Sequence, residues 1–264
     1  MEFGILKMLL SYRHIGNEGK PIIILHGLFG VSDNWVHFAR SISSIANIII
    51  PDLRNHGLSE HSRVHNYDAM MDDVIELMDK LEIEKANIIG HSMGGKLAMK
   101  LALCSPERVG KLMVVDISPR SYKHYNEHQS LIEVMLSVDF DEITSREKAE
   151  TFLAKQIPER RLLLFVLKNL YWIRPNRLGW RLNLNALYEN LPYIYEEITS
   201  STASDVPTLF VRGGLSAYLM EHDIPLIEQL FTHFEIKTIA NAGHWVHADA
   251  EEELLGLAMG FLGG

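Results

Sequence analysis

The sequence is short of cysteine and of positive charge, and it contains no long hydrophobic run. Cys104 is the single cysteine among 264 residues, which excludes an intrachain disulfide and a cysteine-based metal site and favours a reducing compartment. We expect it to be a small buried side chain in a helix. The net charge of −9 argues against nucleic acid as a main partner, because phosphate binding needs a basic face. No apolar run reaches the roughly 18 residues of a transmembrane helix, and the start does not resemble a secretory signal. The expected location is therefore the cytoplasm.

What the chain does contain is a serine between glycines, in Gly90-His91-Ser92-Met93-Gly94. The apolar run before this motif is typical of a buried strand, and the residues after it carry apolar side chains at helical spacing. On such a strand-to-helix turn, small neighbours leave the serine hydroxyl exposed and direct the next backbone N–H groups towards whatever it attacks. A glycine-rich turn that only helps packing is the alternative. The context predicts that Ser92 is a catalytic nucleophile.

A serine hydroxyl is a weak nucleophile and needs a histidine base, together with a carboxylate that orients the base. Thirteen histidines leave the base open by composition, so position must decide. His244 follows a strand-like segment and a glycine, and it precedes a final amphipathic helix. A sharp loop there would bring its ring over the sheet edge. We therefore expect His244 to be the base. His247 is the alternative, and we expect it to pack at the start of the last helix or to steady the loop.

The carboxylate is harder to assign. In most enzymes with a serine nucleophile on this kind of turn, the carboxylate follows the penultimate strand. Residues 207–212 are the expected penultimate strand here, but Ser216 occupies the position where the carboxylate would lie. Glu221 and Asp223 come later and are expected to begin a helix. Asp116 directly ends an earlier strand-like run, on the edge where open α/β sheets build their sites. A turn or N-cap aspartate is the alternative interpretation of this residue. We expect Asp116 to be the acid.

Acyl transfer also creates an oxyanion, which needs N–H donors. The residue after the nucleophile, Met93, is expected to supply one of them. The second is expected from the turn that follows the early apolar strand and begins with His26-Gly27. Leu28 is favoured as this second donor, and Phe29 is the alternative. We expect His26 to brace the loop through a hydrogen bond and not to act as a base.

Four motifs together resemble the α/β-hydrolase fold family of serine hydrolases. They are His26-Gly27-Leu28-Phe29-Gly30, Pro51-Asp52-Leu53-Arg54-Asn55-His56-Gly57-Leu58-Ser59, Gly90-His91-Ser92-Met93-Gly94-Gly95 and Gly243-His244-Trp245-Val246-His247-Ala248. More narrowly, the chain resembles the bacterial YbfF-type esterases, relatives of the animal abhydrolase-domain 11 proteins. That subgroup also takes its triad acid from the position of Asp116, so the resemblance agrees with the argument from Ser216.

Strand-like and helical runs alternate along the chain, which predicts an α/β fold with a mostly parallel central sheet and helices on both faces. The strands are expected near 9–14, 21–26, 47–52, 86–90, 111–116, 208–212 and 235–239. The helices of this part are expected near 35–44, 67–81, 94–104 and 250–261.

Between Ser118 and Ser204 the sequence shows no convincing strand. Helices are expected there near 125–138, 146–156, 159–170 and 183–195. The resemblance implies that residues 118–204 form a helical cap, or lid, inserted after the sixth strand of the fold. Residues 1–117 and 205–264 would then form the α/β-hydrolase core, with a minority of the apolar cap residues facing Ser92.

The resemblance and the residues together imply a carboxylic ester hydrolase that works through an acyl-enzyme on small to medium acyl esters. Neither a metal nor an organic cofactor is required. The expected partner is a small-molecule ester or thioester, without nucleic acid or a membrane span, and the enzyme would be a monomer or homodimer. An acyl-CoA thioesterase and a lipase-like hydrolase remain alternatives. A binding protein that kept the fold without turnover is the alternative from another class.

Overall fold

The computed structural model describes residues 8–44, 46–122 and 126–263 of the chain. Its centre is a seven-stranded sheet with the strand order β1-β3-β2-β4-β5-β8-β9. The first strand pairs antiparallel with its neighbour, and every other pairing in the sheet is parallel. The strands are β1 (Tyr12–Ile15), β2 (Lys20–Leu25), β3 (Ala46–Pro51), β4 (Ala86–His91), β5 (Val109–Val115), β8 (Thr208–Gly213) and β9 (Phe234–Ile239).

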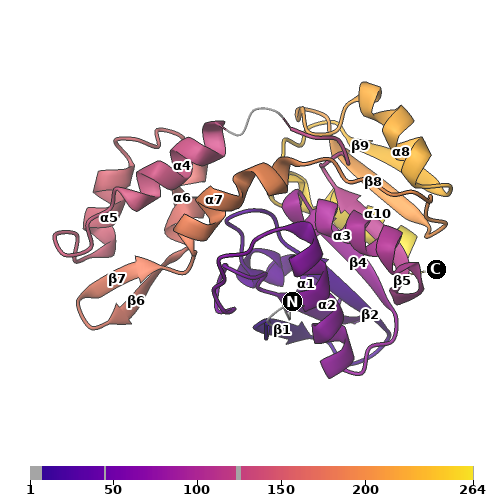
Figure 1. Ribbon diagram of the computed structural model, residues 1–264, viewed down its shortest axis with the longest axis horizontal. Helices are drawn as coiled ribbons and strands as arrows, with labels where there is room; N and C mark the ends of the chain where they lie inside the picture. Colours follow the sequence, from indigo (N-terminus) through magenta and orange to yellow (C-terminus); the bar gives the residue numbers. More distant parts are fainter. Residues whose placement is uncertain (1–7, 45, 123–125, 264) are drawn as a thin grey trace, which may run out of the picture.

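Helices cover both faces of this sheet (Figure 1). In β2, Ile23 and Leu25 face the core shared with α2 (Tyr67–Lys80), α3 (Met93–Cys104) and α8 (Ile224–Leu230). Ile22 and Ile24 face the opposite core, shared with α1 (Val36–Ile42) and α10 (Glu251–Leu262). Successive side chains of a strand point to opposite faces. A parallel strand covered on both faces is therefore a continuous apolar run, which explains why these strands are visible in the sequence.

Four short helical turns complete this part of the chain. They are η1 (Ser32–Trp35), η2 (Pro106–Arg108), η3 (Glu221–Asp223) and α9 (Val246–Asp249). All seven strands expected from the sequence are present, and the α/β class with a mostly parallel sheet is confirmed. Among the described residues, no helix combines the length and the apolar character needed to cross a bilayer.

Residues 118–204, called here the inserted segment, contribute no described residue to the seven-stranded sheet. Figure 1 shows its elements beside the sheet, grouped on the left. The helices are α4 (Asn126–Leu136), α5 (Arg146–Leu153), α6 (Arg160–Leu167) and α7 (Leu184–Tyr195), and the strands are β6 (Leu170–Arg174) and β7 (Arg177–Trp180). The segment follows β5, the fifth strand of this chain and not the sixth. Tyr125, where the first of these helices was expected to begin, lies outside the described residues.

The expectation that the inserted segment contains no strand was wrong. The helix expected near 159–170 ends at Leu167, and the chain continues into an antiparallel hairpin of β6 and β7. Pro175 and Asn176 form its turn: proline fixes φ at the first central position, and Asn176 adopts the positive φ of 62° required at the second. The aromatic and β-branched residues before this turn favour a strand. These local signals were present in the sequence, although the apolar pattern favoured a helix.

Cys104 also differs from expectation, because it is exposed and not buried. It is the last residue of α3 and lies four residues after Lys100, which is itself partly exposed. Residues four apart share one face of a helix. The helix therefore presents both side chains on its outward face, and Cys104 fills no space in the core.

Candidate active site

Ser92 lies at the junction of β4 and α3, in a backbone conformation that few residues adopt (φ 53°, ψ −120°). Such a conformation costs on the order of 1–3 kcal/mol and persists only where the surroundings enforce it. Here β4 and α3 approach too closely for a side chain at Gly90, and α3 lies too close to the end of β2 for one at Gly94. A Cβ on Gly90 would lie 2.3 Å from the Gly94 carbonyl oxygen, and one on Gly94 would lie 2.3 Å from that of Leu25. The sharp turn expected from the sequence is present.

The structure brings together Ser92, His244 and Asp116, which come from three separate loops. His244 Nε2 lies 3.0 Å from Ser92 Oγ, and His244 Nδ1 lies 2.8 Å from Asp116 Oδ2. A neutral imidazole donates from one nitrogen and accepts at the other. With Asp116 as the acceptor, Nδ1 carries the proton and Nε2 is free to accept the hydroxyl proton of Ser92. The imidazole is partly exposed, whereas the carboxylate is fully buried.

His247, the alternative base, is separate from this arrangement. It lies in α9, and its ring stacks on Trp35 with centroids 4.4 Å apart. Burial lowers its pKa to about 4, so the ring is neutral at pH 7. The expectation that His247 packs at the start of the last helical region is confirmed.

The buried Asp116 carboxylate is held by three donors. Its Oδ1 accepts from the Gly213 N–H at 2.9 Å, and its Oδ2 accepts from the Ser216 hydroxyl at 2.5 Å as well as from His244. Asp116 itself has a positive φ of 50°, which a short polar side chain tolerates better than most residues. Three donors from two loops fix the direction in which the carboxylate faces His244.

The two later carboxylates have other partners. Glu221 is exposed and pairs with Arg212 at 2.7 Å. Asp223 is buried, pairs with Arg120 at 2.9 Å and accepts from the Met220 N–H. Both belong to η3, immediately before α8, as expected for residues that begin a helix.

Two further side chains position His244, and neither was expected from the sequence. The Tyr218 ring stacks on the imidazole with centroids 3.9 Å apart and an interplanar angle of 21°. His91, directly before Ser92, donates from Nε2 to the backbone carbonyl of His244 at 2.8 Å. Burial lowers the pKa of His91 well below its usual value, which keeps this ring neutral. The sequence signal for Tyr218 was its place in the same loop as Ser216. His91 gave no such signal, because it occupies a variable position of the serine motif.

The loop after β2 lies against Ser92 from the other side. A Cβ on Gly27 would come within 3.2 Å of Ser92 Cβ, so the loop backbone lies next to the hydroxyl. The Phe29 N–H donates to His56 Nε2 at 3.1 Å, and this alternative donor is therefore already engaged. Among the described residues, neither the Leu28 N–H nor the Met93 N–H has a protein acceptor. Met93 is the first residue of α3, where N–H groups have no intrahelical partner.

Buried histidines brace this loop. His26 Nε2 accepts from the Leu53 N–H at 3.0 Å, and its Nδ1 lies 2.8 Å from the Gly27 carbonyl oxygen. Burial lowers the pKa of His26 and, further, that of His56. Both rings therefore act as neutral donors and acceptors, and the expected bracing role of His26 is confirmed.

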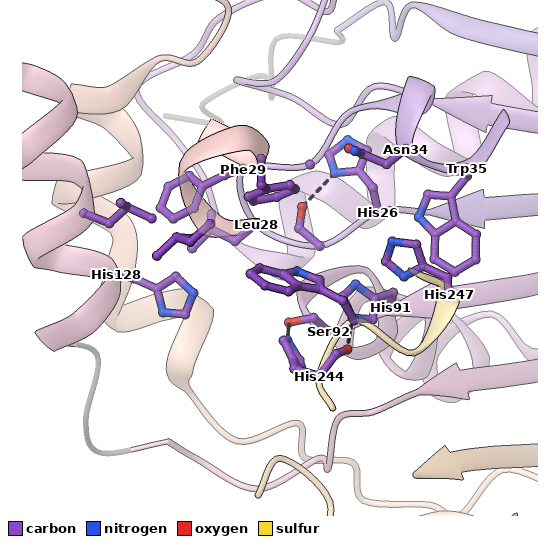
Figure 2. A pocket seen from close by; sticks show the side chains of 16 residues that line it. His26, Leu28, Phe29, Asn34, Trp35, His91, Ser92, His128, His244 and His247 are labelled. Carbon is purple, nitrogen blue, oxygen red and sulfur yellow. Dashed lines mark hydrogen bonds between the residues drawn. The ribbon is translucent and has the colours of Figure 1, made fainter. Parts of the chain in front are cut away.

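A cavity opens beside Ser92, and residues of the core and of the inserted segment line it together (Figure 2). From the inserted segment come His128, Leu131, Leu162 and Phe165. From the core come Leu28, Phe29, Trp35, His91, His244, Trp245 and His247, among others. Most of these side chains are apolar or aromatic, which suits a hydrocarbon group next to the serine. Within the part of the chain that the structure describes, no cluster of side chains suited to holding a metal ion occurs.

Comparison with known proteins gave matches over most of the chain. A family model described as alpha/beta hydrolase fold matches residues 20–251. The chain is 39% identical over 251 residues to the sn-1-specific diacylglycerol lipase ABHD11 of Danio rerio, covering 93% of this chain and 79% of that protein. It is 36% identical over 241 residues to esterase YbfF of Escherichia coli K12, covering 90% of this chain and 91% of that one. A solved marine microorganism esterase has a TM-score of 0.94 and 36% identity, covering 97% of this chain and 100% of that chain.

Proposed function

The chain belongs to the α/β-hydrolase fold family and is a carboxylic ester hydrolase, and on that premise we propose that Ser92, His244 and Asp116 form its catalytic triad. One observation carries the proposal: the continuous hydrogen-bond chain from Ser92 Oγ through the imidazole to Asp116 Oδ2. This is the arrangement that turns a serine hydroxyl into a nucleophile. The substrates are small to medium acyl esters.

The reaction runs in two halves. Ser92 Oγ attacks the ester carbonyl carbon while its proton moves to His244 Nε2, and the carbonyl oxygen becomes an oxyanion. The protonated imidazole then gives that proton to the leaving alcohol, and an acyl-enzyme remains. Water repeats the sequence on the acyl-enzyme and releases the acid. Asp116 keeps the imidazole in the required tautomer and stabilises its positive charge.

The N–H groups of Leu28 and Met93 hold the oxyanion in this proposal. Their support is the position of the Gly27 turn against Ser92 and the lack of a protein acceptor for either group among the described residues. Donors that are already oriented need no reorganisation when the charge develops, so each contributes on the order of 3–4 kcal/mol to transition-state stabilisation. The Phe29 N–H bonded to His56 holds the turn in place.

The inserted segment acts as the cap, and the rest of the chain is the hydrolase core. Leu131, Leu162 and Phe165 support this assignment, because they come from the inserted segment and line the cavity beside Ser92. Polar contacts also join the two parts: Asn169 Nδ2 donates to the Phe29 carbonyl at 2.9 Å. An apolar acyl or alcohol group would lie between the cap and the serine.

We place the enzyme in the cytoplasm, as a monomer or homodimer. A single cysteine suits a reducing compartment. Cell fractionation and light scattering of the purified chain test these two assignments, and a secreted protein or a larger oligomer would contradict them.

Labelling with a serine-directed fluorophosphonate tests the triad. The native chain should take up one label, found by mass spectrometry on the peptide that contains Ser92, and the label should block hydrolysis of a chromogenic ester. Ser92→Ala should lose both labelling and turnover while keeping its melting temperature, because this side chain contributes little packing. A label on another residue, or full activity in Ser92→Ala, would overturn the proposal.

A further inference from the structure

A lysine is buried one helical turn after Ser92. Lys96 lies on α3, four residues beyond the serine, and only 1% of its surface is exposed. Four residues advance a helix by about 6 Å, and helical side chains lean towards the N-terminus of their helix. The aliphatic stem of Lys96 therefore extends along α3 towards the serine.

The ammonium group of Lys96 has a weak set of partners for a buried charge. Its Nζ donates to the backbone carbonyl of Glu196, and it lies 5.0 Å and 5.9 Å from the ring centres of Tyr122 and Tyr67. The ion pairs among the described residues include none for Lys96, whereas Lys100, one turn further on, pairs with Asp68 at 2.8 Å. Burial, with the nearby positive charge of Arg120, lowers the pKa of Lys96 to about 7, although the charges of Glu197 and Glu196 act in the opposite direction. A buried cation without a direct ion pair is costly, and a bound anion would offset that cost.

Lys96 lines a second cavity that also reaches Ser92. The lining residues are Leu28, Tyr67, Ser92, Met93, Lys96, Ile117, Tyr122, His128, Ile194, Tyr195 and Tyr218. None of them is acidic. His128 has a pKa lowered by burial to about 4 and is neutral at pH 7. Lys96 is thus the one side chain in this lining that can be positively charged at pH 7.

The hydroxyl groups of the tyrosines around Lys96 are largely engaged. Tyr67 donates to the Ile194 carbonyl at 2.8 Å, Tyr122 donates to the Tyr218 carbonyl at 2.5 Å, and Tyr195 contacts His128 Nδ1. Their rings form walls, and their polar atoms hold the surrounding backbone. Away from Ser92 and the proposed oxyanion donors, the remaining N–H donors of the ammonium group are what this cavity offers to an anion.

We propose that this cavity is a subsite for a carboxylate at the far end of the acyl group, with Lys96 as its counterion. The inference rests on the proposed function, since it assumes that Ser92 carries the acyl group. The preferred substrates are then monoesters of short dicarboxylic acids, because only about 6 Å of helix separates Ser92 from Lys96. A carboxylate fits better than a phosphate, because one ammonium matches a single negative charge and a phosphate dianion needs further donors.

The test compares two methyl esters of nearly equal size, monomethyl glutarate and the neutral methyl 5-oxohexanoate. Methanol release gives kcat/KM for each, and the ratio of the two values is the measure. The wild type should favour the monoester. Lys96→Met keeps the length of the side chain and removes its charge, and it should lower the ratio by about 10- to 100-fold. Lys100→Met, on the same helix, is the matched control and should leave the ratio unchanged.

A second measurement does not depend on turnover. Calorimetry should detect glutarate binding to Ser92→Ala and its loss in the double variant Ser92→Ala, Lys96→Met, whereas inorganic phosphate should bind more weakly than glutarate. A ratio unaffected by Lys96→Met, or glutarate binding that survives it, would overturn the subsite and mean that Lys96 only secures the Glu196 carbonyl. Tighter binding of phosphate would overturn the choice of ligand.

The two proposals can fail separately. If Ser92 takes no fluorophosphonate and neither ester is hydrolysed, the proposed triad fails, and glutarate binding alone decides the subsite. If the neutral ester is hydrolysed and the wild-type ratio is 1 or below, the subsite fails and the triad stands. If Lys96→Met does not fold, the wild-type ratio alone decides whether the subsite exists.

Discussion

The hydroxyl of Ser216 donates to the carboxylate of Asp116, with 2.5 Å between Oγ and Oδ2. Ser216 occupies the position where most triads of this kind carry their acid. Here that position supports a carboxylate from the neighbouring strand end. The carboxylate thus comes from the residue that follows β5, and a neutral hydroxyl donor comes from the loop after β8.

Asp116→Asn should lower kcat/KM by a factor on the order of 10³–10⁴, because asparagine keeps the shape but favours the wrong imidazole tautomer. Glu221→Gln is the control, since Glu221 is exposed and pairs with Arg212, and it should change activity little. Steady-state kinetics on a chromogenic ester measure both. Small and equal losses in the two variants would show that Asp116 is not the acid.

The double variant Asp116→Asn, Ser216→Asp should recover part of the activity that Asp116→Asn loses, to within about 10- to 100-fold of the wild type. The reason is geometric: the Ser216 side chain reaches the same carboxylate oxygen that His244 contacts. Ser216→Asp alone should lower activity, because two adjacent carboxylates repel one another. No recovery in the double variant would mean that His244 cannot be reached from the end of β8.

His244→Ala should be as inactive as Ser92→Ala, because triad members act as a unit and their losses do not add. His247→Ala should instead lower the melting temperature, since it removes the stack on Trp35, and should reduce kcat/KM by less than about tenfold. Kinetics and thermal unfolding of the same preparations separate the two effects. The reverse ranking of the two histidines would identify His247 as the base.

Acid should destabilise the fold through its buried histidines. His65 is fully buried, and burial lowers its pKa from 6.5 to about 3. Between these two values the unfolded chain binds more protons than the folded chain. The contribution of His65 to the free energy of unfolding is therefore fully present above about pH 6.5. It is lost as the pH falls, by up to about 1.4 kcal/mol per pH unit. Urea unfolding at several pH values between 5 and 8 measures this slope.

His65→Phe removes the titrating group and should make that pH dependence shallower. The substitution is judged by the slope and not by the absolute stability, because a new ring also changes packing. An unchanged slope would show that the acid sensitivity arises elsewhere.

Local sequence signals predicted the serine turn well. Gly90, Ser92 and Gly94 lie within five residues of one another, and the close approach that requires glycine at position 90 is to Gly94 in the same stretch. Asp116 was singled out because it directly follows the apolar strand β5, and His244 because it follows a glycine in the loop after β9. The contact between Asp116 and His244 depends on the order of the strands in the sheet. Parallel pairing and the family resemblance indicate that order.

Other features depend on contacts between distant parts of the chain, which a local pattern does not specify. Tyr218 stacks on His244, a residue of a different loop. The burial of Lys96 results from α7 and the Tyr122 loop closing over α3. A lysine in a helix otherwise suggests a solvated side chain. The hairpin of β6 and β7 was missed for a different reason, since its apolar residues fit a helix as well as a strand.

His91 joins Ser92 to the loop that carries His244. It precedes Ser92 in the chain, and its ring nitrogen holds the backbone of His244 at 2.8 Å. One ring thus acts as a spacer between Ser92 and the backbone of His244. The hydrogen bond ties the position of the His244 loop to the end of β4, the strand that leads into Ser92.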